Sequence, residues 1–131
     1  TQLCMTMDWS RTMLELGGGQ PDPAYPLDGV SLAAVLRDPS HRFDHPLYWR
    51  MNHRGQRALR SGDWKYLRVD GHDDLFNLAQ DERERANLGQ REPQRLGALR
   101  TQWEHWNASV PPIPADATVS LGYSSKDMPQ R

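Results

Sequence analysis

The chain has 131 residues, of which 37% are hydrophobic and 25% charged, and its formal net charge is −1. That length corresponds to one domain with a modest core, and the ten glycines and ten prolines favour a loop-rich globular protein over a helical bundle. The balanced, interspersed charge argues against a nucleic-acid partner, and no apolar run reaches the roughly 20 residues that span a bilayer.

The amino-terminal residues 1–7 alternate between apolar and polar side chains, as in a strand that has lost its sheet. We expect this segment to be poorly ordered or to mediate self-association. The segment has neither an initiator methionine nor the order of a signal peptide, which is typical of a fragment of a longer chain, or of a chain whose first residue was removed. One cysteine, Cys4, allows no internal disulfide and favours a reducing, cytoplasmic compartment.

Two short helices are predicted next. Asp8 is a good N-cap, and Trp9, Met13 and Leu16 follow at helical spacing until a run of three glycines ends the pattern. Residues 20–29 contain three prolines and are predicted to form a loop. A second helix is predicted over residues 32–36, with a serine before it as cap.

The pattern then changes to that of strands, which are predicted over residues 47–51, 56–60, 64–69 and 75–78. Turns are predicted at residues 61–63, where Gly62 supplies a positive φ, and at residues 70–73. Pro93 is suited to the first turn of a helix, and an apolar stripe follows it, which must be buried against the sheet. The stripe consists of Leu96, Leu99, Trp103 and Trp106.

The predicted fold is therefore α+β: two short helices, a four-stranded antiparallel sheet, and a C-terminal helix packed on that sheet. Residues 111–131 are predicted to be an extended tail, because they are rich in proline and show no periodicity.

Candidate chemistry is sparse. His41 and His45 have the spacing of two metal ligands on a helix, but neighbouring prolines disfavour a helix there, and we predict no metal site. We predict no catalytic residue in this chain. Cys4 has no basic neighbour that would activate a thiol, so a buried apolar role is favoured over a nucleophile.

A basic cluster follows the first strand and comprises Arg50, His53, Arg54 and Arg57. Guanidinium groups match the edge of an oxyanion, so the cluster is a candidate site for a sulfate ester or another anion. The favoured interpretation of the cluster itself is a solvated loop whose charges pair with Asp44 or Asp63. Trp64 and Tyr66 could form a sugar-stacking platform, although core residues under a helix are the favoured interpretation.

Residues 58–67, ALRSGDWKYL, and residues 74–78, DLFNL, resemble a stretch near the carboxyl end of sulfatases. Other segments match that family in order: residues 6–18 resemble its "DlxPTlLelAG" helix, with Arg11 where proline is usual. Residues 27–32 resemble "lDGvSLlPlL", residues 81–88 resemble "DpxExxNLa", and residues 96–106 resemble the closing helix. The resemblance spans about Met5 to Pro112.

The resemblance implies a division of the chain. Residues 1–40 would belong to, or join, a missing N-terminal sulfatase domain, which would be the partner of this chain. Residues 41–110 would form the C-terminal α+β subdomain, and 111–131 the tail.

The resemblance also implies that the longer parent hydrolyses sulfate esters, using a formylglycine and a bound divalent cation, usually calcium. The family's Cys-x-Pro/Ala-x-Arg motif is not found around Cys4, so the isolated chain is expected to be inactive. By analogy, His53 and Arg54, with Arg50, would face the substrate pocket. Two alternatives stay open: a stand-alone module that binds a sulfated or phosphorylated ligand through Trp49 and this cluster, and a structural or oligomerising domain.

Overall fold

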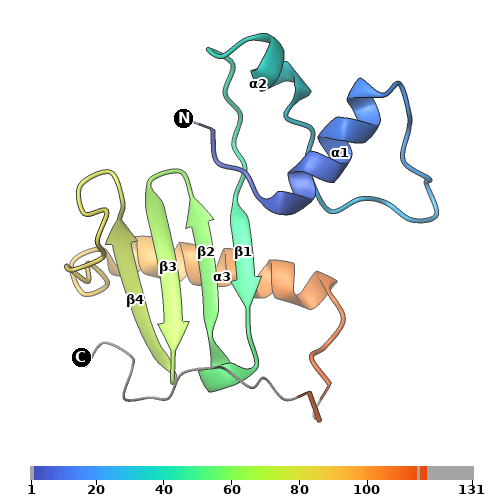
Figure 1. The fold of residues 1–131 in the computed structure, drawn as a ribbon. Coiled ribbons are helices and arrows are strands. Elements are labelled where there is room, and N and C mark those ends of the chain that lie inside the picture. Colours follow the sequence, from blue (N-terminus) through green and yellow to red (C-terminus); the bar gives the residue numbers. More distant parts are fainter. Residues whose placement is uncertain (1, 115, 118–131) are drawn as a thin grey trace. The chain divides into compact units, whose positions relative to one another are not determined.

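A computed structural model describes residues 2–114, 116 and 117 of the chain (Figure 1). These residues form two compact units, which are described separately: residues 2–47 with Arg60–Trp64, and Tyr48–Leu59 with the described residues from Lys65 onward. The domain boundaries predicted after residues 40 and 110 refer to a longer protein, so they stay a prediction. Most of the predicted tail, residues 111–131, lies outside the described residues.

The first unit contains the helices α1 (Thr6–Leu16) and α2 (Ala33–Arg37). Helix α1 begins two residues before Asp8, so the prediction of Asp8 as N-cap is wrong, as is strand character for Thr6 and Met7. Asp8 lies in the first turn instead, where its carboxylate accepts a hydrogen bond from the Met5 N–H at 2.5 Å. A carboxylate that reaches back to the N-cap amide stabilises a helix start as well as a cap residue does.

Gly29 marks the closest approach between the loop that follows α1 and the helix itself. A Cβ at this position would collide with the Met7 carbonyl and would lie 2.8 Å from the Asp8 amide nitrogen. The loop can therefore lie directly against the helix only because residue 29 has no side chain.

The four strands are β1 (Leu47–Arg50), β2 (Arg57–Ser61), β3 (Trp64–Val69) and β4 (His72–Asn77), and they pair in that order. Consecutive arrows run in opposite directions, which confirms the antiparallel sheet (Figure 1). The turn at Gly62, with φ of 56°, is as predicted. The next turn is tighter than predicted: Asp70 and Gly71 have φ values of 51° and 83°, so β4 begins at His72 rather than residue 75.

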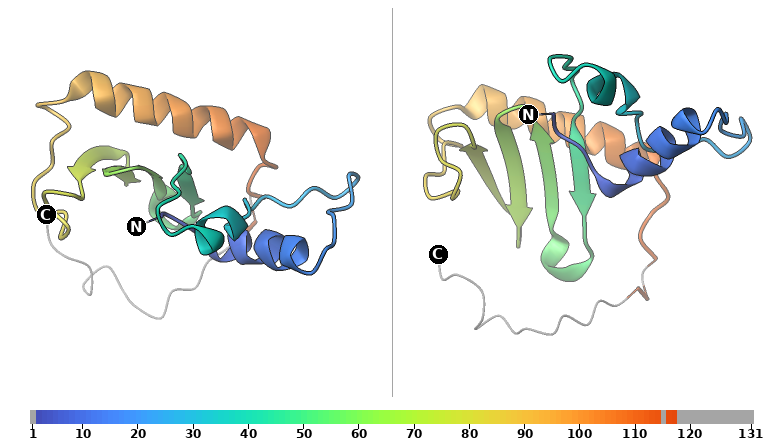
Figure 2. Two further views of the ribbon diagram at one scale, coloured as in Figure 1. Left: turned by 90° about the horizontal axis from the view of Figure 1, so that it is seen from above. Right: turned by 45° about the horizontal axis from the view of Figure 1, so that its top comes forward.

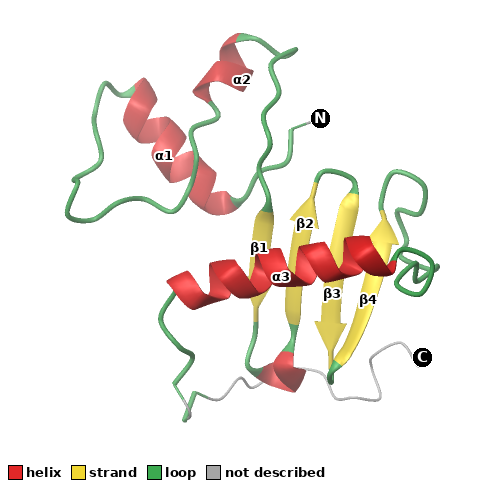
Figure 3. Cartoon of the chain, turned by 180° about the vertical axis from the view of Figure 1, so that it is seen from behind, coloured by secondary structure: helices red, strands yellow, loops and turns green. Residues whose placement is uncertain are grey.

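Helix α3 (Pro93–Ser109) lies across one face of the sheet (Figures 2 and 3). Its Leu99 and Trp103 are buried, as the apolar stripe predicts, whereas Leu96 and Trp106 are half-buried. The Trp103 indole N–H donates to the Trp49 carbonyl at 3.0 Å, and the Arg57 guanidinium lies 4.8 Å from the centre of the Trp103 ring. Burial, a hydrogen bond and a cation–π contact thus hold this one side chain.

The predicted fold class is confirmed: an α+β chain with two short helices, a four-stranded antiparallel sheet and a C-terminal helix. None of the helices in the described part of the chain is both long and apolar enough to cross a membrane.

Two glycine substitutions should have opposite effects on stability. Gly29→Ala should lower the free energy of unfolding by about 1–3 kcal/mol, because the new Cβ collides with backbone. Gly97→Ala, inside α3 with no atom within 4 Å of the added Cβ, should raise it by about 0.5–1 kcal/mol. Urea unfolding followed by circular dichroism measures both. An unchanged midpoint for Gly29→Ala would contradict the close approach described above.

Candidate functional site

The residues predicted to bind an anion lie in the loop between β1 and β2, within the second unit. Arg50 ends β1, and His53 and Arg54 belong to a short 3₁₀ turn, η1 (His53–Gly55). The Met51 N–H donates to the Gln56 carbonyl at 2.9 Å, which closes the loop on itself. Arg54 has φ of 55°, a left-handed conformation that is uncommon for a residue with a side chain.

Arg54 is held in that conformation by Asp70 in the turn between β3 and β4. Its Nε lies 2.9 Å from Asp70 Oδ2, and one terminal nitrogen contacts the same oxygen. The Asp70 N–H donates to the Arg54 carbonyl at 3.0 Å. The hydrogen bond to Asp70 raises the pKa of Arg54, and the same contact, with a smaller effect from the charge of His53, lowers the pKa of Asp70.

Arg50 makes different contacts. One guanidinium nitrogen donates to Asn107 Oδ1 on α3 at 3.0 Å, and another donates to the Pro111 carbonyl at 2.5 Å. This side chain therefore ties the end of β1 to the end of α3. The structure brings His53 and Arg54 together around Asp70, while Arg50 is engaged by residues of and beyond α3.

The expected ion-pair partners of the cluster, Asp44 and Asp63, are not the ones observed for Arg54. Asp70 takes this place because the two-residue turn at Asp70 and Gly71 presents its carboxylate to the β1–β2 loop. The sequence signal that could have revealed it is the Asp-Gly pair, which is typical of a tight hairpin turn. The role of Asn107 as a partner of Arg50 had no local sequence signal.

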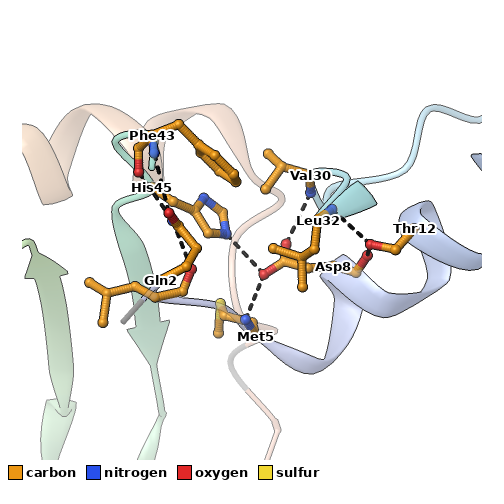
Figure 4. Close-up of polar contacts among 9 residues, drawn as sticks. Gln2, Met5, Asp8, Thr12, Val30, Leu32, Phe43 and His45 are labelled. Atoms are coloured by element: carbon orange, nitrogen blue, oxygen red, sulfur yellow. Dashed lines mark hydrogen bonds and ion pairs between the residues drawn. The ribbon is translucent and has the colours of Figure 1, made fainter. Parts of the chain in front are cut away.

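A second polar cluster lies in the first unit and centres on the carboxylate of Asp8, which is fully buried (Figure 4). Oδ1 accepts from the Val30 N–H at 2.9 Å, and Oδ2 accepts from Met5 and lies 2.9 Å from His45 Nε2. Thr12, one turn later and also fully buried, donates to the Asp8 carbonyl at 2.6 Å. Its hydroxyl in turn accepts from the Leu32 N–H at 2.9 Å, so α1 holds three other segments through two side chains.

Burial alone would raise the pKa of Asp8, but the hydrogen bonds from Met5 and Val30, and the hydrogen bond and charge of His45, outweigh it. The pKa of Asp8 therefore lies below its ordinary value of 3.8. A carboxylate whose two oxygens already accept from these donors is suited to holding the fold rather than to moving a proton. His45 serves here as a partner of Asp8.

Three other candidates have structural roles or exposed positions. Tyr66 is fully buried and its hydroxyl donates to Asp73 at 2.9 Å; burial first, then this contact, raise its pKa to about 12. The core interpretation of Tyr66 is thus confirmed over a sugar platform. Cys4 is exposed, so its predicted burial is wrong. Among the residues that the structure describes, no group of three or more His, Cys, Asp or Glu side chains is placed to hold a metal ion.

An open groove runs along α3 beside β1 in the second unit. Its lining includes Tyr48, Gly97, Thr101, His105 and Trp106. The Tyr48 and Trp106 rings stack on each other with their centres 4.8 Å apart and their planes 12° apart. One face of each ring is therefore already used within the protein.

Comparison with solved structures shows which proteins share this fold. A structure from work on the metabolism of multiple glycosaminoglycans by Bacteroides thetaiotaomicron matches with a TM-score of 0.67 and 17% identity over 77% of this chain and 24% of that chain. A 2-O glycosaminoglycan sulfatase matches with a TM-score of 0.61 and 20% identity, over 78% and 24% of the two chains. The chain has the fold of a carboxyl-terminal sulfatase region.

A structure in complex with its substrate, D-glucosamine-2-N,6-O-disulfate, is also similar, with a TM-score of 0.61 and 16% identity over 77% of this chain and 23% of that one. This chain thus spans about a quarter of the length of the sulfatase-like structures that it matches. No family model matches the sequence, and no curated protein matches it.

Asp8→Asn should destabilise the first unit by about 2–3 kcal/mol at pH 7, because the amide cannot replace a carboxylate that accepts from Met5, Val30 and His45. The pKa of Asp8 in the folded protein lies below its ordinary value of 3.8. The contribution of the ionised carboxylate to the free energy of unfolding is therefore complete above pH 3.8, and it is lost as the pH falls through the pKa of the folded state. The difference between variant and wild type should therefore shrink in acid. Urea unfolding at pH 7 and pH 3 tests this, with the exposed Asp28→Asn as control; an equal loss at both pH values would contradict it.

Proposed function

We propose that this chain is the carboxyl-terminal part of a sulfatase-like hydrolase and that the longer parent hydrolyses sulfate esters. The observation that carries the proposal is the match of 77% of this chain to 24% of a sulfatase-like chain at a TM-score of 0.67. The order of the sequence segments that resemble sulfatases supports it independently, because those segments follow one another at the family's spacing.

In this proposal the catalytic machinery lies in the missing N-terminal domain. The formylglycine and the divalent cation, calcium in most of the family, would be held there and would supply the nucleophile and the charge that stabilises the reacting sulfate. The described residues of this chain do not fit the cation, since they form no group of three candidate ligands. No step of the reaction is assigned to them.

The contribution of this chain would be to the substrate pocket, through His53 and Arg54 of the β1–β2 loop. Arg54 keeps a positive charge beside Asp70, and its fixed left-handed backbone orients the guanidinium. Arg50 is the weakest of the three candidates, because Asn107 and Pro111 already accept from it. Because these hydrogen bonds already occupy the Arg50 guanidinium, they also disfavour the alternative of a stand-alone anion-binding module built on this cluster.

The proposal predicts that activity belongs to the longer protein. The purified 131-residue chain should not hydrolyse 4-nitrophenyl sulfate above a blank without protein. The protein encoded by the continuous reading frame that includes the sequence upstream of Thr1 should do so, and that upstream sequence should contain a Cys-x-Pro/Ala-x-Arg motif. Turnover by the isolated chain, or an upstream sequence without that motif, would overturn the assignment.

Substitutions in the β1–β2 loop should weaken substrate binding by the longer protein. Combining His53→Ala with Arg54→Gly, in which glycine keeps the left-handed backbone, should raise KM for a sulfated substrate roughly tenfold with little change in kcat. Steady-state kinetics measures both constants, with the exposed Arg83→Ala as control.

Asp70→Asn separates substrate contact from loop stability. It weakens the ion pair with Arg54 but leaves the guanidinium in place, so KM should stay within about twofold of the wild-type value. An equal rise in KM for Asp70→Asn and for the double variant would show that Arg54 acts only by holding the loop.

A further inference from the structure

After α3 ends, the chain runs back toward the β1–β2 loop (Figure 3), and two side chains of that connection hold it there. Arg50, the last residue of β1, donates to the Pro111 carbonyl at 2.5 Å. The Asn52 side-chain amide donates to the Ala117 carbonyl. The segment that follows α3 is therefore fastened at two points, and both anchors come from one short stretch of the second unit.

The stretch between the two anchors forms an arch, by which we mean the described residues 111–114, 116 and 117. Its prolines at positions 111, 112 and 114 fix φ near −65°, so this part of the chain is stiff and extended. The Ala117 N–H donates to the Pro114 carbonyl at 3.0 Å, which closes a turn just before the second anchor. Local sequence thus shapes the arch, and the β1–β2 connection holds it in place.

The arch presents an apolar surface. Its prolines are exposed, as is Ile113 with an exposed fraction of 38%, whereas Ala117 at the anchor is half-buried. Proline has no backbone N–H, so the exposed part consists mainly of pyrrolidine rings and one branched side chain. Such a surface interacts with the apolar face of a ligand ring rather than with its charged groups.

Asn52 connects this apolar surface to the cationic part of the loop. His53 and Arg54 follow it directly in the short turn η1, and the Gly55 N–H donates to the Asn52 carbonyl at 3.2 Å. The backbone of Asn52 is thus fixed to the turn that carries Arg54, while its side chain is fixed to the arch. One exposed residue therefore sets the position of the arch relative to the two candidate pocket residues.

We propose that the arch is a specificity-determining wall of the substrate pocket, and that Asn52 and Arg50 are the positioning residues that hold it. This inference rests on the proposed function, in which His53 and Arg54 face that pocket. The ligand that fits is a sulfate ester whose organic part has an apolar ring face, which lies on Ile113 and the prolines while its polar groups meet the loop. Arg50 then acts through the arch rather than by touching the ligand.

Ile113→Ser in the longer protein tests the contact with the organic part of the substrate. KM for 4-nitrophenyl sulfate should rise about fivefold with kcat within about twofold of wild type, because apolar contact is lost equally in the ground and transition states. The inhibition constant of inorganic sulfate should stay unchanged, since that ion has no organic part. The melting temperature should also stay unchanged, because the Ile113 side chain is exposed.

Two substitutions of Asn52 test its positioning role in the same protein. Asn52→Ala removes the donor to the Ala117 carbonyl and should raise KM for 4-nitrophenyl sulfate about threefold, again with little change in kcat. Asn52→Gln keeps an amide donor and should return KM close to the wild-type value. Gln90→Ala, at another exposed amide side chain in a loop, is the matched control and should leave both constants unchanged.

The outcomes separate this inference from the proposed function. If the longer protein hydrolyses 4-nitrophenyl sulfate but Ile113→Ser and Asn52→Ala leave KM unchanged, the arch is not part of the pocket and the proposed function stands. A parallel rise in KM and in the inhibition constant of sulfate would also contradict the inference, because the organic part would then not be what the arch contacts. Failure of Asn52→Gln to restore KM would refute the positioning role. A longer protein without sulfatase activity would overturn both proposals.

Discussion

The buried carboxylate of Asp8 is the contact on which the first unit depends. It gathers donors from Met5, Val30 and His45, which lie in three different segments of the chain. Charge-assisted hydrogen bonds of this kind are strong, and leaving any of the donors buried without an acceptor is costly. The inward face of α1 is consequently polar, and its apolar stripe must face outward. The network and the outward apolar stripe of Trp9, Met13 and Leu16 are two consequences of one helix orientation.

The second unit is organised by apolar burial instead. Helix α3 covers one face of the sheet with Leu99 and Trp103, and the indole N–H of Trp103 is satisfied by a strand carbonyl. The tight turn at Asp70 then positions a carboxylate beside Arg54, and this pair gives the β1–β2 loop its shape. The sheet thus supports a charged loop, and the proposed contribution to a substrate pocket depends on this arrangement.

Much of this fold follows from local sequence. The strands and α3 were predictable because side-chain periodicity and turn residues act over a few positions, and the stripe from Leu96 to Trp106 needs only helical geometry. Gly62 is predictable for the same reason, since a positive φ is a property of one residue. The family resemblance likewise rests on short segments in order. By itself, the sequence determined the fold class and pointed to sulfatases.

Tertiary structure alone decided which residues meet. Asp8 was predictable as a helix-start residue, but its partners Val30 and His45 lie 22 and 37 positions away. Arg54 reaches an aspartate 16 positions away, and Arg50 reaches an asparagine 57 positions away. No local pattern encodes such pairings, because they depend on how loops return to the same place. Amphipathic periodicity likewise showed that α1 has an apolar face, but only the buried polar network decided that this face points outward.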